Sequence, residues 1–146
     1  MPVTAEALGK LLLKENYKII TQKYLNYLKE KSGYHPGIDY RARTPLKVYS
    51  PVRGKVSSTG AIGRVSVKIE GTNLYFIFLH LSKFSVGAGA EVAVGTLIGY
   101  TGSAGTSAPH LHVEARRDSE LAARYFKTAT DTGRNVNPTS VVNAPK

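Results

Sequence analysis

Hydrophobic and polar positions follow two different patterns along this chain, and the change occurs near residue 33. Over residues 4–31, apolar side chains recur at three- and four-residue steps, which predicts helix. Thr4 is the expected N-cap and Gly33 the expected stop. Glu15 and Asn16 weaken the apolar stripe, so one long helix and two shorter helices both fit the pattern.

From residue 34 onward, short β-rich runs are separated by Gly and Pro, and this close spacing predicts antiparallel strands. The expected strands are Leu46–Tyr49, Gly54–Ser58, Val65–Ile69, Leu74–Leu81, Glu91–Val94, Leu97–Tyr100 and His110–Ala115. Residues 118–126 fit a short helix with Asp118 as N-cap, and the segment after Gly133 is expected to be a fraying loop. The predicted fold is therefore mainly β, an antiparallel sheet or sandwich with an added N-terminal α-helical segment.

Composition narrows the classes of protein that fit. The 146 residues contain no cysteine, which excludes disulfides, thiolate metal sites and a cysteine nucleophile. No apolar run approaches the roughly 20 residues that a membrane-spanning helix needs. The net charge of +10 indicates an anionic partner, and nucleic acid, anionic lipid and an anionic cell-wall polymer all satisfy it.

The four histidines carry the chemistry that the sequence offers. His35 and Asp39 lie four residues apart around a Pro-Gly turn, which can bring an imidazole and a carboxylate to one point. His110 and His112 lie two residues apart, so on a strand they share one face. His80 closes a strongly apolar strand.

Each of these residues taken alone has a simple structural explanation. A His-x-His pair is more often incidental than a ligand set, His80 can be a core histidine, and Asp39 can bond its own backbone in a turn. Taken together, imidazoles and one carboxylate at strand ends and tight turns favour a metal site over these separate explanations. Two His and one carboxylate suit catalytic zinc, with the fourth position left for water.

In these motifs the chain resembles the lysostaphin/LytM-type zinc metallopeptidases, which cut peptide bridges of bacterial peptidoglycan. The motifs are His35-Pro36-Gly37-Ile38-Asp39, then Leu79-His80-Leu81-Ser82, then Pro109-His110-Leu111-His112-Val113-Glu114. The resemblance covers about residues 34–140. It implies a LytM-type metallopeptidase domain over 34–140, preceded by a helical segment over 1–33 and followed by a tail over 141–146.

The resemblance also assigns roles within the motifs. It makes His35, Asp39 and His112 the zinc ligands, and it makes His80 and His110 an unliganded catalytic pair, without saying which of the two is the base. Glu114 shares a strand face with His112, where it either orients a ligand or is a solvated charge. The small residues of 99–108 are expected to form a flexible wall of a substrate groove. Family members often bind the oxyanion with a tyrosine, and nine tyrosines leave that assignment open.

The implied function is zinc-dependent cleavage of peptide cross-links in peptidoglycan, the anionic partner that the charge suggests. The bond cut is either D-Ala to meso-diaminopimelate or Gly-Gly. The N-terminal residues lack the basic region of a cleavable secretion signal, so a phage lysin or a secreted antibacterial effector acting in the cell envelope or outside the cell is expected. The sequence names no inhibitor or immunity protein.

Other classes of function fit less well. A non-catalytic wall-binding or hydrolase-activating relative would typically lose metal ligands, and this chain keeps them all. A biotinyl- or lipoyl-type carrier domain would need a Met-Lys-Met turn, which is absent. No nucleic-acid partner is expected, because the lysines are scattered and no recognised nucleic-acid motif accompanies them. The N-terminal segment is expected to close the core, with an arm that occludes the groove as the alternative.

Overall fold

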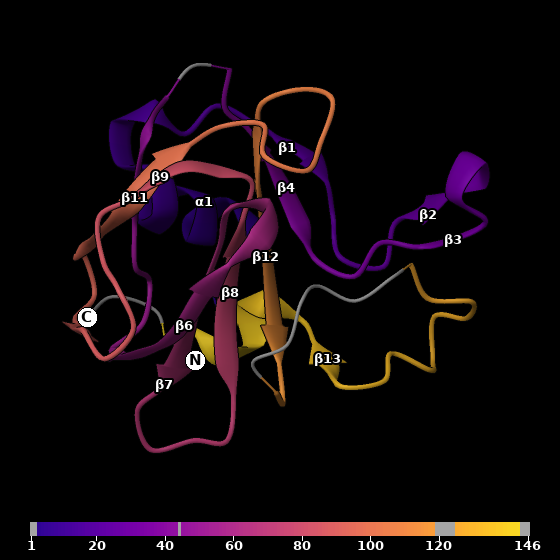
Figure 1. The fold of residues 1–146 in the computed structure, drawn as a ribbon. Coiled ribbons are helices and arrows are strands. Elements are labelled where there is room, and N and C mark those ends of the chain that lie inside the picture. Colours follow the sequence, from indigo (N-terminus) through magenta and orange to yellow (C-terminus); the bar gives the residue numbers. More distant parts are fainter. Residues whose placement is uncertain (1–2, 44, 119–124, 144–146) are drawn as a thin grey trace.

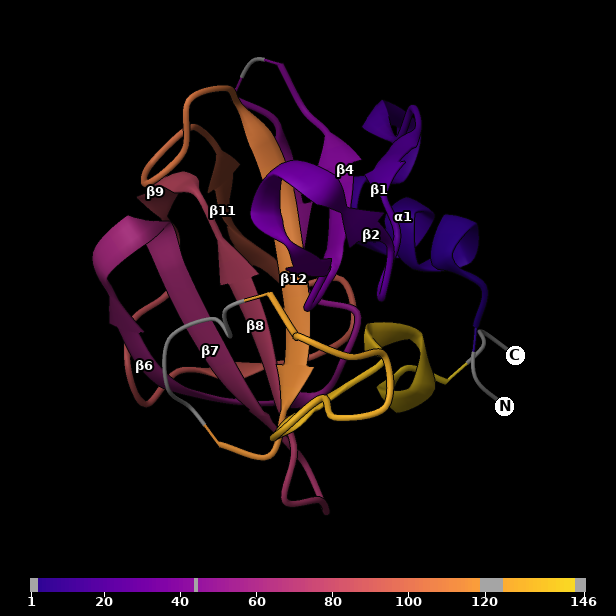
Figure 2. The same ribbon diagram turned by 90° about the vertical axis from the view of Figure 1, so that its right-hand side faces the viewer.

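The computed structural model describes residues 3–43, 45–118 and 125–143, and its fold is mainly antiparallel β with one α-helix in these ranges (Figure 1). The strands of the larger sheet, in spatial order, are β1 (Ile20–Gln22), β4 (Ile38–Arg41), β12 (His110–Arg116), β8 (Tyr75–Leu79), β7 (Arg64–Ile69), β6 (Gly54–Gly60) and β10 (Glu91–Val92). Figure 2 shows β4, β12, β8, β7 and β6 side by side, with β12 between β4 and β8. The motif strands β4 and β12 are therefore direct neighbours.

Smaller elements surround this sheet. A second sheet contains β5 (Lys47–Tyr49), β11 (Leu97–Thr101) and β9 (Leu81–Phe84), a hairpin pairs β2 (Tyr27–Leu28) with β3 (Gly33–Tyr34), and β13 (Asn135–Val136) pairs with β12. The helical elements are α1 (Ala5–Leu13) and the 3-10 turns η1 (Lys14–Asn16), η2 (Lys29–Lys31), η3 (Ala61–Gly63) and η4 (Pro138–Val141). The β2–β3 hairpin projects from the body of the molecule (Figure 1).

The two larger sheets share one hydrophobic core. Val48 and Ile98 of the smaller sheet lie in the same buried cluster as Phe76 and Phe78 of β8. Burial of such side chains contributes about 1.5–3 kcal/mol each. The antiparallel β fold predicted from the spacing of apolar runs is confirmed, and every predicted strand has a counterpart in the structure.

The predicted strand Leu74–Leu81 is divided in two. His80 adopts a left-handed conformation with φ of 69°, and its N–H donates to the carbonyl of Ile62 at 2.9 Å. This conformation is incompatible with a continuous strand, so β8 ends at Leu79 and β9 begins at Leu81. The break at His80 is the first sign that this residue does more than end a strand.

The predicted helix over residues 4–31 is wrong beyond its first part. Thr4 caps α1 as expected, its Oγ1 accepting from the N–H of Ala7 at 3.0 Å, but the helix ends at Leu13. Lys14 and Leu25 have positive φ angles of 50° and 66°, which no continuous helix permits. The segment between them includes β1, whose β-branched Ile20 and Thr21 fit an extended strand better than a helix.

The helix that does form belongs to the core. Leu8, Leu12 and Leu13 of α1 are fully buried and lie in the main hydrophobic cluster. This confirms the expectation that the N-terminal residues close the core. The described residues include no helix with the length and apolar character that crossing a membrane requires.

The expected fraying of the chain after Gly133 is also wrong up to residue 143. Asn135 is 1% exposed and pairs in β13 with Arg116 of β12, and Val142 is 1% exposed in the core. Side-chain packing and hydrogen bonding order this segment, although its local sequence is typical of a loop. The predicted short helix over 118–126 cannot be compared, since residues 119–124 lie outside the described residues.

Candidate metal centre

The register between β4 and β12 brings two of the predicted motifs together. Asp39 lies directly opposite His112, and Arg41 lies directly opposite His110. Directly opposed residues of antiparallel strands project from the same face. Asp39, Arg41, His110 and His112 therefore all project on one side of the sheet.

Gly37 allows the turn before β4 to pass close to β12. A Cβ at this position would collide with the carbonyl oxygen of Val113 and would lie 2.9 Å from Nε2 of His112. With hydrogen in its place, the backbone approaches closely enough for His35 to reach the face that carries Asp39. The Pro-Gly turn predicted to fold His35 and Asp39 toward one point does so.

His35, Asp39 and His112 together form a group that can hold a metal ion. One ligand atom from each lies within 4.8 Å of the other two. Asp39 lies between the imidazoles, with Oδ2 at 3.2 Å from Nε2 of His35 and Oδ1 at 2.6 Å from Nδ1 of His112. Two imidazole nitrogens and one carboxylate are a donor set that fits zinc, so the residues present suit that metal.

In His35 and His112, one ring nitrogen is held by a hydrogen bond, and this determines which of the two nitrogens faces the centre. Nδ1 of His35 lies 3.3 Å from the carbonyl of Lys23, which can only accept, so this nitrogen carries the proton and Nε2 is left available to a metal ion. Nε2 of His112 lies 2.8 Å from Oε2 of Glu114, so it donates to the carboxylate and Nδ1 is left available to a metal ion. Such partners fix the orientation of a metal-binding imidazole.

Glu114 is fully buried, which removes the alternative of a solvated strand charge. Its Oε1 accepts from Nδ2 of Asn135 at 2.8 Å, and the same amide group donates to the carbonyl of Pro36 at 2.9 Å. Arg116 places Nη1 at 2.6 Å from Oδ1 of Asn135. Asn135 of β13 thus holds the Glu114 carboxylate that orients His112. The same Asn135 amide also binds Pro36, in the segment before β4.

The charges around the centre favour one protonation pattern when no metal is bound. Burial lowers the pKa of His112, but the carboxylates of Asp39 and Glu114 outweigh it and raise that pKa to about 9. Burial raises the pKa of Asp39, but the hydrogen bonds and charges of His112 and His35 outweigh it and hold the pKa well below its usual range. The carboxylate of Asp39 is therefore ionised in the folded protein at neutral pH.

His80 and His110 lie beside this group without belonging to it. Their ring centroids are 4.6 Å apart, and Nε2 of His110 lies 3.5 Å from Oδ1 of Asp39. Each ring has its Nδ1 next to a backbone carbonyl, that of Ala104 at 2.7 Å for His80 and that of Ala108 at 3.1 Å for His110. Both rings therefore carry a proton on Nδ1, which leaves Nε2 as the basic nitrogen when the ring is neutral. Burial lowers the pKa of His80, so this ring is neutral at pH 7.

A pocket of about 440 Å³ opens over these residues, and the small-residue loop forms one wall. Gly105, Thr106 and Ser107 line it together with Gln22 and Tyr125. Part of the segment 99–108 therefore lines a pocket beside the histidines, and its role as a wall of a substrate groove stays a prediction.

Sequence reasoning missed Gln22, Tyr125 and Asn135 as residues of the site. Tyr125 is the tyrosine that lines this pocket within the described ranges, and burial raises the pKa of its hydroxyl. None of the three lies in a motif. Gln22 belongs to the segment predicted as helix, and Asn135 to the segment predicted as a fraying loop.

Comparison with known proteins places this geometry in a family. Residues 33–138 match the model of Peptidase family M23. The glycyl-glycine endopeptidase ALE-1 of Staphylococcus capitis is 36% identical over 98 residues, 60% of this chain and 26% of ALE-1. This chain thus spans about a quarter of the length of that curated relative.

Solved structures of the family have the same fold. The catalytic domain of the prophage-encoded M23 protein EnpA from Enterococcus faecalis superposes with a TM-score of 0.66 at 25% identity, covering 85% of this chain and 90% of that one. The catalytic domain of the antimicrobial peptidase lysostaphin from Staphylococcus simulans gives a TM-score of 0.62 at 27% identity, covering 73% and 84%. With its motifs assembled around one centre, its fold shared and most of its length matched, the chain belongs to Peptidase family M23.

Proposed function

We propose that this protein is a zinc-dependent endopeptidase that cleaves peptide cross-links of peptidoglycan. The observation that carries the proposal is the arrangement of His35, Asp39 and His112 within 4.8 Å of one another, directly beside His80 and His110. Peptidases of this family are zinc-dependent, and the relative ALE-1 is a glycyl-glycine endopeptidase. We assign His35, Asp39 and His112 as the metal ligands.

The two remaining histidines are the proposed acid–base pair. When bound, zinc supplies a Lewis acid that polarises a carbonyl oxygen and makes water more acidic. The neutral ring of His80 presents an unprotonated Nε2, which can accept a proton from the attacking water and return it to the leaving amine, and His110 is the second proposed member of the pair. The protonated form of either ring, and the hydroxyl of Tyr125, can donate to the oxygen that becomes negative in the transition state.

The shape of the site supports a peptide substrate. The loop that contains Gly105, Thr106 and Ser107 presents small side chains, so an extended chain of small residues can approach its backbone. The carbonyl of Ala104, in the same loop, holds Nδ1 of His80. The wall of the groove and one member of the proposed acid–base pair are therefore positioned by one loop, which couples substrate contact to acid–base geometry.

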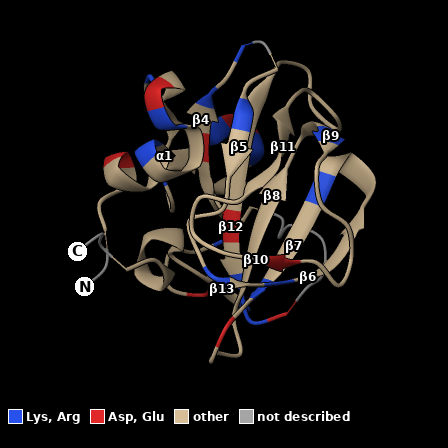
Figure 3. Cartoon of the chain, turned by 90° about the vertical axis from the view of Figure 1, so that its left-hand side faces the viewer, with Lys and Arg blue, Asp and Glu red and all other residues tan. Residues whose placement is uncertain are grey.

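A role as a phage lysin or an antibacterial effector is the finer part of this proposal. The similarity to a prophage-encoded domain, at a TM-score of 0.66 and covering 90% of that chain, supports it. The net charge of +10 suits an anionic wall. Basic residues occur on several elements, α1 and β5 among them (Figure 3), which fits a diffuse attraction to a polymer. Lysis of living cells by added protein would support this role, and hydrolysis confined to isolated walls would contradict it.

The experiment that tests the activity is digestion of purified sacculi with and without a zinc chelator, followed by mass spectrometry of the soluble fragments. We expect conversion of cross-linked dimers to monomers, abolished by the chelator and restored by added zinc. His110→Ala serves as the matched variant, because we expect it to bind zinc and to release almost nothing. The fragment masses also identify the bond that is cut.

Two results would overturn the proposal. A zinc-loaded protein that releases no fragment from walls of either cross-link type is not a peptidoglycan endopeptidase. A purified protein that neither contains zinc nor takes it up would favour a non-catalytic wall-binding relative, and binding to sacculi without hydrolysis would then be its measurable activity.

A further inference from the structure

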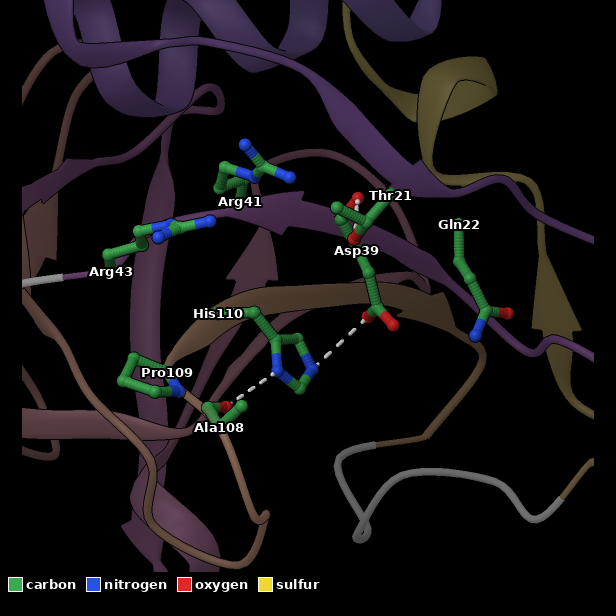
Figure 4. A pocket seen from close by; sticks show the side chains of 8 residues that line it. All are labelled: Thr21, Gln22, Asp39, Arg41, Arg43, Ala108, Pro109 and His110. Carbon is green, nitrogen blue, oxygen red and sulfur yellow. Dashed lines mark hydrogen bonds and ion pairs between the residues drawn. The ribbon is translucent and has the colours of Figure 1, made fainter.

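A second pocket adjoins the proposed metal centre. It has a volume of about 580 Å³ and is lined by Thr21, Gln22, Asp39, Arg41, Arg43, Ala108, Pro109 and His110. Figure 4 looks into it, with Asp39 and His110 joined by a dashed line. Gln22, Asp39 and His110 line both pockets, so the two pockets adjoin at the proposed reaction site.

Arg41 and Arg43 line this pocket because side chains alternate between the two faces of the sheet along β4 and in the residues that follow it. Tyr40 and Ala42 are buried in the core at 0% and 1% exposure, which turns the residues between and beside them to the other face. Asp39, Arg41 and Arg43 therefore share the face of the metal centre. The register places Arg41 directly opposite His110. The side chain of Arg41 therefore projects from the same face of the sheet as a proposed catalytic histidine.

Both arginines are exposed, and neither forms an ion pair with any described residue. Asp39 is the acid that lines this pocket, and its carboxylate already contacts His35, His110 and His112. The pocket thus carries two guanidinium groups that form no ion pair with a carboxylate of the described residues. Guanidinium groups bind carboxylates through paired, charge-assisted hydrogen bonds, which are stronger than hydrogen bonds between neutral groups.

We propose that Arg41 and Arg43 form a carboxylate-binding subsite that selects peptides with a free carboxylate beside the scissile bond. This inference rests on the function proposed above and narrows its substrate. A D-alanyl–meso-diaminopimelate cross-link has a carboxylate on the carbon that bears the scissile nitrogen, whereas an oligoglycine bridge has none within its chain. The subsite therefore favours direct stem-peptide cross-links over the glycyl-glycine bonds that give ALE-1 its name.

The test uses the zinc-loaded protein and two soluble substrates. One is a cross-linked stem-peptide dimer with this carboxylate free, and the other is the same dimer with the carboxylate converted to an amide. The variant is Arg41→Gln/Arg43→Gln. The matched control is Arg53→Gln/Lys55→Gln, which removes the same charge from exposed residues near and on β6, outside this pocket.

We expect the unmodified protein to cleave the free carboxylate substrate with a kcat/KM about 10- to 100-fold above that of the amide, as for hydrogen bonds to charged groups. Arg41→Gln/Arg43→Gln should remove this preference by lowering kcat/KM on the carboxylate substrate alone. The control should keep the preference. Equal cleavage of both substrates by the unmodified protein would overturn the inference, as would an equal loss on both in the double variant.

Failure of the inference can be told apart from failure of the proposed function. If the protein cleaves neither dimer, the binding of both peptides is measured by calorimetry. Tighter binding of the free carboxylate, lost in Arg41→Gln/Arg43→Gln and kept in the control, would support the subsite while contradicting the endopeptidase. Equal binding of both peptides would overturn the subsite, whatever the protein hydrolyses.

Discussion

Asp39 and His110 lie 3.5 Å apart, yet they belong to two differently built halves of the site. On the ligand side, the side chains of His35 and His112 are 2% and 8% exposed, and that of Glu114 is fully buried. On the solvent side, the side chain of His110 is 22% exposed. The first half is tied together by side-chain hydrogen bonds, while the second is attached mainly to backbone carbonyls.

The difference follows from the two tasks that we propose. Residues that hold a metal ion must keep a fixed geometry, and burial with paired carboxylates and imidazoles provides it. Residues that move a proton must reach the substrate, and in His80 one hydrogen bond to a backbone carbonyl orients the ring while Nε2 remains for proton transfer. Glu114, the acidic residue of β12, lies on the ligand side of this division.

The largest expected effect comes from breaking the ligand side. His112→Ala removes a proposed ligand and leaves Asp39 and Glu114 without their shared partner, so zinc content and hydrolysis should both fall to background. Elemental analysis of the purified variant and release of fragments from sacculi measure the two. His110→Ala, two residues away on the same strand, should keep its zinc. His35→Ala is the substitute if His112→Ala is insoluble, and stoichiometric zinc in either ligand variant would contradict the assignment.

Breaking the solvent side should affect rate but not metal. His80→Ala removes a proposed acid–base group, so kcat should fall by about 100- to 10,000-fold. Zinc content and the melting temperature of the zinc-loaded protein are measured on the same sample. Full activity of His80→Ala would refute its proposed role, and loss of zinc would move His80 to the ligand side.

Glu114→Gln sharpens the comparison, because it keeps the size of the side chain and removes the negative charge that faces His112. Loss of such a partner typically weakens metal binding about 10- to 100-fold. Competition with a chelator of known affinity measures the change. Glu30→Gln is the matched control, because Glu30 also lines the groove but is exposed. Equal zinc affinity of the two variants would show that the Glu114 carboxylate does not support His112.

The smallest expected effect on activity comes from α1, outside both halves. Leu12→Ala empties a fully buried position and should lower the free energy of unfolding by about 2–5 kcal/mol. Leu11→Ala, at a partly buried position, should cost less. Denaturant unfolding measures the stability of both variants, and hydrolysis per folded molecule should not change. A higher activity in Leu12→Ala would instead indicate that the N-terminal segment obstructs the groove.

The sequence predicted the motif residues better than the segments that surround them. His110 and His112 could be assigned to one face because a period of two requires only that the segment be a strand. The chain between Lys14 and Leu25 could not be predicted, because its apolar spacing imitates a helix and the positive φ angles that end the helix leave no pattern.

Contacts between distant parts of the sequence were equally inaccessible. Asn135 reaches Glu114 from 21 residues away, and this contact depends on the pairing of β13 with β12. Arg41 and Arg43 were visible as basic residues near a motif. Only the register of β4 against β12 puts Arg41 opposite His110, and only the buried Tyr40 and Ala42 show which face the two arginines share.

The alternation along β4 has a consequence for how such a protein can diversify. Tyr40 and Ala42 maintain the core, and Asp39 maintains the centre, so substitutions at these positions are under selection for folding and metal binding. Arg41 and Arg43 neither pack in the core nor belong to the proposed metal centre, so both positions can be substituted without loss of the fold. If the proposed subsite is correct, two substitutions at Arg41 and Arg43 would change which cross-link the protein prefers, and redesign of its specificity would begin at these two positions.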